Sequence, residues 1–273
     1  MKFRTLFILF NVILIVFLAI LCLTPTFLLG AAFASAFWRS NWFLVLILAA
    51  ILVGFDSYFI INRQLYALLE REDWPALVHY LEDRVVRQGK YNAHLVRLLA
   101  NTYLVLSDSP SVMSLENKAA IARPSLVENN ALIFGAARIL GRDIPGAVRF
   151  FETRVSTAKP AQRQWMHWYH GFALLLNKQY EKSAEEFSLL ARSGSDGVTA
   201  GLAAFFLADT LAKALPDKAA DLEAAAAEGK ERVLKSMPQP RDWARETTRI
   251  CTEIHAAALS KYMEESGAWL YKG

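Results

Sequence analysis

The sequence predicts an all-α membrane protein, because two long apolar segments open the chain, a helix-forming composition follows them, and a repeat of about 35 residues runs through the rest. The chain has 273 residues and a formal net charge of +4. Beyond Arg63 it is rich in Ala, Leu, Glu, Lys and Arg and shows little of the Val/Ile/Thr alternation typical of strands. We therefore expect a transmembrane helical hairpin in residues 1–62, a helical domain in residues 63–237 and a capping helix in residues 238–273.

Two apolar segments, about residues 5–23 and 42–61, are predicted to span the lipid bilayer. Each has about 20 residues, which lets a helix rising about 1.5 Å per residue cross about 30 Å of hydrocarbon. A cleaved signal peptide is the alternative for the first segment, because Lys2 and Arg4 precede it. No small-x-small cleavage site follows at a suitable distance, so two spans are the better interpretation.

The connection between the spans, residues 24–41, is itself largely apolar. Pro25 predicts that the first helix ends or kinks there, which would leave Phe27 to Trp38 along the interface. Alternatively, the helix continues through Pro25 and tilts. The sequence leaves both versions open.

Basic residues flank the outer ends of the two spans more than their connection. Lys2 and Arg4 precede the first span, Arg63 and Arg71 follow the second, and Arg39 stands in the connection. By the positive-inside rule, both termini and the helical domain are predicted to be cytoplasmic, at a bacterial inner membrane.

Each span carries a polar residue, Asn11 in the first and Asp56 in the second. Each lies about six residues from the cytoplasmic edge of its span, so an antiparallel hairpin places the two at matching depth and allows a hydrogen bond. An ionisable residue inside a span is a functional candidate. Pairing of the hairpin or snorkelling of Asp56 towards water is the structural alternative.

The repeat begins just after the second span. The segments YALLEREDWPALVHYLE, from Tyr66, and FALLLNKQYEKSAEEFS, from Phe172, align without a gap 106 residues apart, which is three periods of about 35. Filling in the period gives equivalent positions at Leu65, Ala100, Gly135, Gly171 and Leu207. In the two best copies, Gly135 precedes Ala147 and Phe151 as Gly171 precedes Ser183 and Phe187.

These positions resemble the tetratricopeptide repeat (TPR) family, whose motif of about 34 residues has a small residue in the first helix and a small and a large apolar residue in the second. The resemblance covers roughly Gln64 to Gly229 and implies about five helix pairs stacked as an α-solenoid with a concave inner face. An irregular helical bundle is the alternative. The layout, two spans before such repeats, is loosely similar to that of HemY-type proteins.

The C-terminal stretch after Pro238 and Pro240 has helical spacing over about 25 residues. We predict one helix that caps the solenoid, with a partner-binding helix as the alternative.

The resemblance also implies a peptide-binding site, because TPR ligands usually contact the inner face of each first helix. Arg97, Asn101 and Asn129 could hold a carboxylate or backbone amides. Trp165, Trp168 and Phe172 form a stripe that suits either a peptide or the core. The positions carried over are His94, Arg97, Asn101, Asn129, Leu132, Trp165, Trp168 and Phe172.

Other chemistries lack a motif. There is no run of five Lys or Arg for nucleic acid, no Gly-rich phosphate loop and no GxSxG. His167 and His170 could be a metal pair, but a third ligand of convincing spacing is missing. Cys22 and Cys251 indicate neither a disulfide framework nor a metal cluster. We expect no cofactor, no metal and no enzymatic activity.

The predicted function is therefore that of a membrane-anchored scaffold or adaptor that binds protein or peptide partners at the membrane surface. The alternative is a non-catalytic subunit of a membrane transport or envelope machine, whose transmembrane helices contact the core complex.

Overall fold

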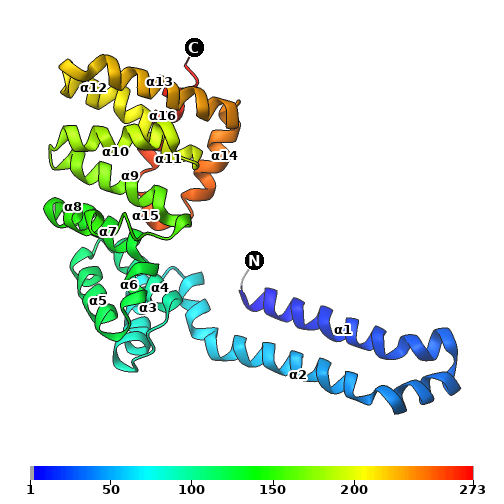
Figure 1. The fold of residues 1–273 in the computed structure, drawn as a ribbon. Coiled ribbons are helices and arrows are strands. Elements are labelled where there is room, and N and C mark those ends of the chain that lie inside the picture. Colours follow the sequence, from blue (N-terminus) through cyan, green and yellow to red (C-terminus); the bar gives the residue numbers. More distant parts are fainter. Residues whose placement is uncertain (1–2, 273) are drawn as a thin grey trace. The chain divides into compact units, whose positions relative to one another are not determined.

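The computed structural model describes residues 3–272, which form helices and no strands (Figure 1). Lys2 and the side chains of Arg4 and Cys22 lie outside the described residues. Two compact units are present, Met1–Tyr80 and Leu81–Gly273. The all-helical class predicted from composition is confirmed.

The first unit begins with a hairpin of two long helices, α1 (Phe3–Leu29) and α2 (Ala31–Glu70). Pro25 lies inside α1, so the first helix continues through the proline. The chain turns at Gly30, whose φ of +84° is readily adopted by glycine. The stretch 31–40, expected to connect the spans, is helical and joins the second span across a kink at Asn41 (φ −120°, ψ 22°).

Aromatic side chains join the two helices of the hairpin. The rings of Phe10 and Phe55 stack with centroids 4.7 Å apart, and those of Phe7 and Phe59 lie 5.2 Å apart. Apolar side chains also point outward, such as Ile13, which is 59% exposed. Large exposed apolar side chains on a helix suit a hydrocarbon environment better than water.

Helices long and apolar enough to cross a membrane occur in this hairpin. Phe7–Leu28 meets the requirement, and the bent pair Ala31–Leu44 and Ala49–Glu70, at 41°, meets it together. Gly197–Ala214 also meets it by length and composition, but 67% of that stretch is buried, as expected for a core helix. The N-terminal apolar helix is thus a candidate membrane span.

The second predicted span and the helix expected to begin the repeats are one element. Helix α2 bends by 41° between Leu44 and Ala49 and then continues from Ala49 past Arg63 to Glu70. The segment INRQLYALLERE has no Gly or Pro and consists largely of strong helix formers. This composition suits a continuous helix, and the expected domain boundary after residue 62 falls inside α2.

The helices after α2 pair into hairpins. Within each pair the second helix packs against the first, and α4, α7, α9 and α11 follow one another as neighbours (Figure 1). A single short helix, α6 (Pro124–Asn129), stands between two pairs. Helix α3 (Trp74–Glu82) follows the end of α2 and continues directly into the short π-helix η1 (Asp83–Arg87). The pairs after it are α4 (Ala93–Val105) with α5 (Ser109–Ala122); α7 (Ala131–Leu140) with α8 (Ile144–Glu152); α9 (Pro160–Leu176) with α10 (Tyr180–Ser193); and α11 (Gly197–Phe206), continued by η2 (Leu207–Leu211) and α12 (Ala212–Ala214), with η3 (Pro216–Lys218) and α13 (Ala219–Ser236).

The turns inside these hairpins repeat one backbone geometry. A non-glycine residue with positive φ, between 53° and 61°, follows the ends of α2, α4, α7 and α9 in the left-handed conformation common at helix C-termini. These residues are 35, 35 and 36 positions apart: Glu72, Ser107, Arg142 and Lys178. In three turns the next residue is an aspartate whose carboxylate accepts a backbone N–H and caps the second helix: Asp73, Asp108 and Asp143.

Small residues let the two helices of a hairpin approach. A Cβ atom on Gly135 would lie 2.1 Å from Cζ of Phe151, and one on Gly171 would lie 2.8 Å from Cε1 of Phe187. Both phenylalanines are fully buried. The glycine and phenylalanine pairs found in the sequence are therefore contacts within hairpins.

The C-terminal stretch is three helices instead of the single helix predicted. They are α14 (Pro240–Ile250), α15 (Ile254–Ala257) and α16 (Ser260–Leu270). Helix α14 packs against α11, α15 against α4 and α7, and α16 against α11 and α14. The C-terminal segment, residues 237–272, therefore runs back along the first helices of the hairpins (Figure 1).

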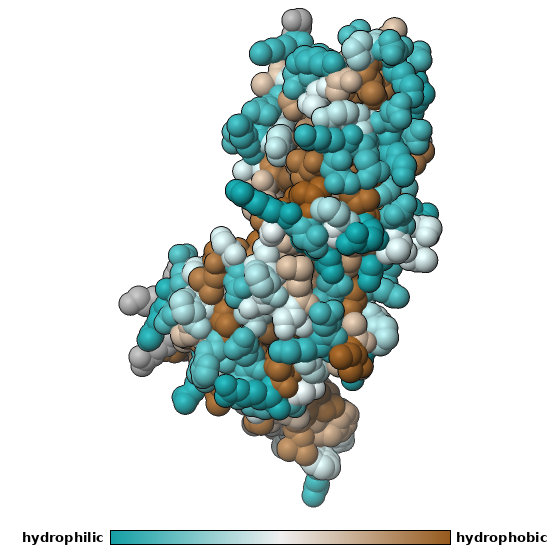
Figure 2. Space-filling view, turned by 90° about the vertical axis from the view of Figure 1, so that its left-hand side faces the viewer, coloured by the Kyte–Doolittle hydropathy of each residue, from teal (hydrophilic) through white to brown (hydrophobic). Residues whose placement is uncertain are grey.

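The helices that follow the N-terminal hairpin, α4 to α16, form the helical body. Hydrophilic side chains cover most of the face of this helical body that Figure 2 shows. Hydrophobic residues appear between them, and three exposed ones recur near the ends of first helices, at Val105, Leu140 and Leu176. Scattered exposed apolar residues of this kind are normal on a soluble surface.

Candidate binding site on the inner face

The inner face is the surface of α4, α7, α9 and α11 against which the C-terminal segment packs. The predicted aromatic stripe lies on it and is buried: Trp165, Trp168 and Phe172 are 8%, 0% and 5% exposed. The three aromatic side chains are therefore part of the core in this structure.

The C-terminal segment supplies the groups that cover these aromatic side chains. The ring of His255 in α15 lies edge-on to Trp165, with centroids 6.0 Å apart. Tyr262 in α16 lies edge-on to Phe172, at 5.6 Å. The chain itself thus occupies the place where the resemblance to TPR proteins implied a peptide.

One hydrogen-bonded pair fixes α15 on the inner face. The hydroxyl of Tyr169 donates to the carbonyl oxygen of His255 at 2.8 Å and lies 3.1 Å from Nδ1 of the same residue. Burial, and then the nearby charge of Arg97, lower the pKa of His255 to about 4. The imidazole is therefore neutral at physiological pH, which suits its buried position.

Part of the inner face remains open. A pocket of about 360 Å³ is lined by four of the predicted residues, Arg97, Asn129, Leu132 and Trp165. The guanidinium of Arg97 donates from Nε to Oδ1 of Asn130 and from Nη2 to the carbonyl oxygen of Asn129, both at 3.3 Å. These bonds use two of its N–H donors and leave others for a ligand.

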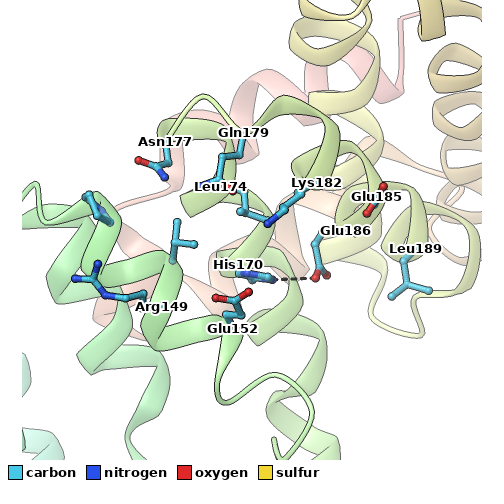
Figure 3. Close-up of a pocket in the computed structure, with 12 residues that line it drawn as sticks. Arg149, Glu152, His170, Leu174, Asn177, Gln179, Lys182, Glu185, Glu186 and Leu189 are labelled. Atoms are coloured by element: carbon cyan, nitrogen blue, oxygen red, sulfur yellow. Dashed lines mark hydrogen bonds and ion pairs between the residues drawn. The ribbon is translucent and has the colours of Figure 1, made fainter.

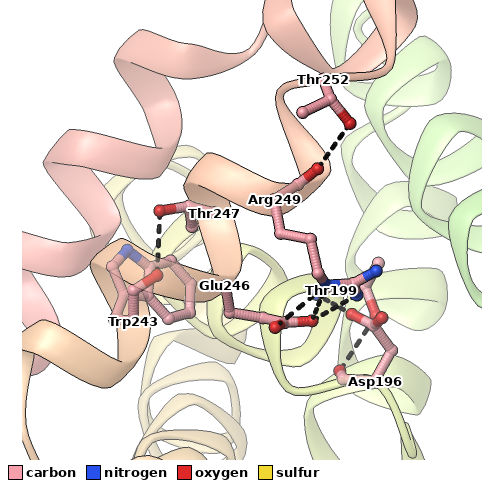
Figure 4. Close-up of polar contacts among 7 residues, drawn as sticks. All are labelled: Asp196, Thr199, Trp243, Glu246, Thr247, Arg249 and Thr252. Carbon is pink, nitrogen blue, oxygen red and sulfur yellow. Dashed lines mark hydrogen bonds and ion pairs between the residues drawn. The ribbon is translucent and has the colours of Figure 1, made fainter. Parts of the chain in front are cut away.

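The C-terminal segment forms the opposite wall of this pocket, which the sequence did not predict. Arg249 of α14 binds the carboxylate of Glu246 and lies close to Asp196, whose carboxylate accepts the backbone N–H of Thr199 at 2.8 Å (Figure 4). The hydrogen bond to Glu246 and the charge of that carboxylate raise the pKa of Arg249, and the charge of Asp196 adds a smaller contribution. Glu253 and Thr252 complete this wall.

Trp243 anchors the wall. It is 4% exposed, and its indole Nε1 donates to the carbonyl oxygen of Met263 at 3.0 Å. A Cβ atom on Gly201 of α11 or on Gly267 of α16 would lie 2.7 Å from the indole. The two glycines therefore make the space in which the tryptophan joins α14 to both helices.

The remaining predicted residues lie apart from the pocket. His94 is exposed, and Asn101 is partly buried with an Oδ1 atom that lacks a hydrogen-bond partner among the described residues. In the hairpin, Asn11 donates its amide to the carbonyl oxygen of Phe7 at 3.1 Å. The described contacts do not join Asn11 to Asp56.

The pocket combines a cation, amide groups, carboxylates and an apolar floor, which suits an extended peptide better than a metal. Within the described part of the chain, no group of three or more His, Cys, Asp or Glu residues is placed to hold a metal ion.

Comparison with known proteins places the chain among relatives from Treponema. The model of a family described as "Uncharacterised Treponema protein" matches residues 111–272. The chain belongs to this family. A protein of Treponema pallidum (strain Nichols), described as an uncharacterized protein, is 27% identical over 281 residues, which are 99% of this chain and 88% of the relative. No solved structure matches the chain.

The family match covers most of the pocket on the inner face. It runs from α5 to α16, so it includes the C-terminal segment, Trp165 and both walls of the pocket except Arg97. The match to the Treponema pallidum protein spans nearly the whole chain and so includes the N-terminal hairpin.

Proposed function

We propose that the chain is a membrane-anchored, TPR-like adaptor that binds a segment of a partner protein in the open part of the inner face. The repeated turn geometry at intervals of 35, 35 and 36 residues supports the TPR-like assignment. So do the close contacts of Gly135 with Phe151 and of Gly171 with Phe187.

The observation that carries the proposal is that one pocket gathers side chains from three successive first helices and their junctions. Arg97 comes from α4, Leu132 from α7 and Trp165 from α9. An extended peptide presents alternating backbone groups and side chains along such a surface. Arg97 and the amide of Gln162 offer donors to its carbonyl groups, and Trp165 offers an apolar contact.

The N-terminal hairpin supplies the membrane attachment in this proposal. Its outward-facing apolar side chains and the length of Phe7–Leu28 suit a bilayer. The arrangement of basic residues favours a cytoplasmic position for both termini, at a bacterial inner membrane.

Photo-crosslinking in membranes tests the proposal. A photoreactive amino acid at Ala161, an exposed position that lines the pocket, is expected to form a discrete adduct with a partner protein. Arg97→Gln should reduce that adduct about tenfold, because it removes a charge-assisted hydrogen bond to the partner. Arg123→Gln, at an exposed position outside the pocket, is the matched control and should leave the adduct unchanged.

A second photoreactive position separates the two predicted functions. Ile60 lies in α2 and is 60% exposed. Adducts that form from Ile60 and not from Ala161 would contradict the adaptor and favour a subunit whose transmembrane helices contact a larger complex.

A further inference from the structure

A second pocket, of about 550 Å³, lies between α8, α9 and α10 (Figure 3). Its volume falls within the range of about 300–1,000 Å³ that is usual for small-molecule sites. Val148 and Leu174 form its buried apolar floor. None of the residues predicted to bind a peptide lines it, so it is a separate site from the pocket on the inner face.

His170 and Glu186 line one wall of this pocket, and His167 also contacts the glutamate. The two oxygens of the Glu186 carboxylate lie 2.7 Å from Nδ1 of His167 and 2.8 Å from Nδ1 of His170. Burial tends to raise the pKa of Glu186, but the hydrogen bonds from the two imidazoles outweigh it and hold the pKa at about 2. The carboxylate is therefore ionised and acts only as an acceptor, so each Nδ1 must carry the proton.

The hydrogen bond from Nδ1 to Glu186 fixes the imidazole ring of His170 and leaves its second nitrogen, Nε2, without a hydrogen bond. The Nε2 atom is buried and has no hydrogen-bond partner among the described residues. In the neutral ring it is an acceptor, and a carboxylate behind Nδ1 makes it a stronger one. Buried polar atoms normally have partners, so an acceptor left over at a pocket wall indicates that a donor belongs there.

Charged side chains of both signs surround this acceptor (Figure 3). Arg149 and Glu152 come from α8, and Lys182 and Glu185 from α10; all four are exposed. In the part of the chain that the structure describes, no ion pair joins any of them to another residue. The rim therefore offers unneutralised cations and carboxylates around an apolar floor.

We propose that this pocket binds a small zwitterion of the amino-acid or short-peptide class. The ammonium group of the ligand donates to Nε2 of His170 and pairs with Glu152. Its carboxylate pairs with Lys182 and Arg149, and its side chain contacts Val148 and Leu174. A simple anion or a simple cation would leave one set of these charges unmatched, which is why a ligand carrying both fits best.

Isothermal titration calorimetry on the full chain in detergent tests this inference. The probes are leucine, alanyl-leucine and trialanine at millimolar concentration, each beside its N-acetylated and C-amidated forms. At least one unmodified probe should bind, and blocking either terminus should weaken it about tenfold or more, because each block removes one charge-assisted pairing. Failure of all three to bind, or equal binding of the blocked forms, would overturn the assignment.

Substitutions of exposed side chains test whether the ligand binds in this pocket and leave the buried core unchanged. Lys182→Gln and Glu152→Gln alter exposed side chains and should each raise the dissociation constant about tenfold. Lys118→Gln, an exposed lysine on α5 away from the pocket, should leave it unchanged. Unaltered binding in both pocket variants would show that the ligand binds elsewhere. The outcome is independent of the adaptor proposal, since Ala161 and Arg97 line the other pocket.

Discussion

Gly135 and Gly171 show how single residues set the spacing of the hairpins. Each faces a fully buried phenylalanine of the following helix, and the space available differs between them. The nearest atom to a Cβ on Gly135 would be 2.1 Å away, and that for Gly171 would be 2.8 Å away. The pairs were visible in the sequence because small and aromatic residues recur at a fixed spacing.

Replacing these glycines with alanine should destabilise the helical body in a defined order. Overpacking costs about 1–3 kcal/mol, and the gain in helix propensity from Gly to Ala offsets about 1 kcal/mol. We expect Gly135→Ala to lower the free energy of unfolding by about 2 kcal/mol and Gly171→Ala by less. Urea unfolding followed by circular dichroism measures both.

A compensating change serves as the control. Phe151→Leu shortens the side chain that meets the new methyl group, so the double variant Gly135→Ala with Phe151→Leu should be less destabilised than the sum of the two single changes. Strict additivity would show that the ring of Phe151 is not the cause.

The C-terminal segment shows, at the scale of elements, what periodicity alone misses. Trp243, Ile250 and Ile254 have continuous helical spacing, which predicted one helix. The structure breaks that helix between Ile250 and Ile254, because each piece finds a different partner surface. Tyr169 and His255 bond across 86 residues of sequence, and no local signal marks such a contact.

Acidification should loosen α15 from the inner face. The pKa of His255 is lowered from 6.5 to about 4 in the folded chain, by burial and then by Arg97. Between pH 6.5 and pH 4, His255 is protonated when α15 is detached and neutral when α15 is packed on the inner face. The packed state is therefore fully stable above pH 6.5 and loses stability as the pH falls towards 4. The loss is about 3 kcal/mol over the window.

Hydrogen exchange of residues 254–257 at pH 7 and pH 4.5, corrected for the intrinsic rate, measures this change. His255→Asn removes the titrating group near Arg97 and Tyr169, so its exchange should not vary with pH in this range. A wild-type chain whose corrected protection is the same at both pH values would contradict the role of His255.

At the scale of the whole molecule, the sequence predicted the helical class and the N-terminal hairpin, but not how the C-terminal segment packs on the inner face. Composition and apolar runs predicted the helical class and the N-terminal hairpin, and the period of about 35 residues recurs in the turns at Ser107, Arg142 and Lys178. Arg97, Asn129, Leu132 and Trp165 were placed on one face by the resemblance to TPR proteins, and they line one pocket in the structure. Its opposite wall depends on how the C-terminal segment returns, and that depends on tertiary contacts.

The C-terminal segment limits the surface that the inner face presents to a partner, and the pocket near Arg97 and Gln162 stays open. Trp243 is the main anchor of the segment that covers the rest, and truncating a buried tryptophan costs about 3–5 kcal/mol. Trp243→Ala should therefore release the segment and expose the aromatic side chains beneath it.

Hydroxyl-radical footprinting of the full chain in detergent measures this exposure directly. We expect Trp165 and Tyr169 to be protected in the wild-type chain and several-fold more reactive in Trp243→Ala. Phe187, fully buried in α10, should stay protected in both and serves as the internal control. High reactivity of Trp165 and Tyr169 in the wild-type chain, or no increase in the variant, would contradict an inner face covered by the C-terminal segment.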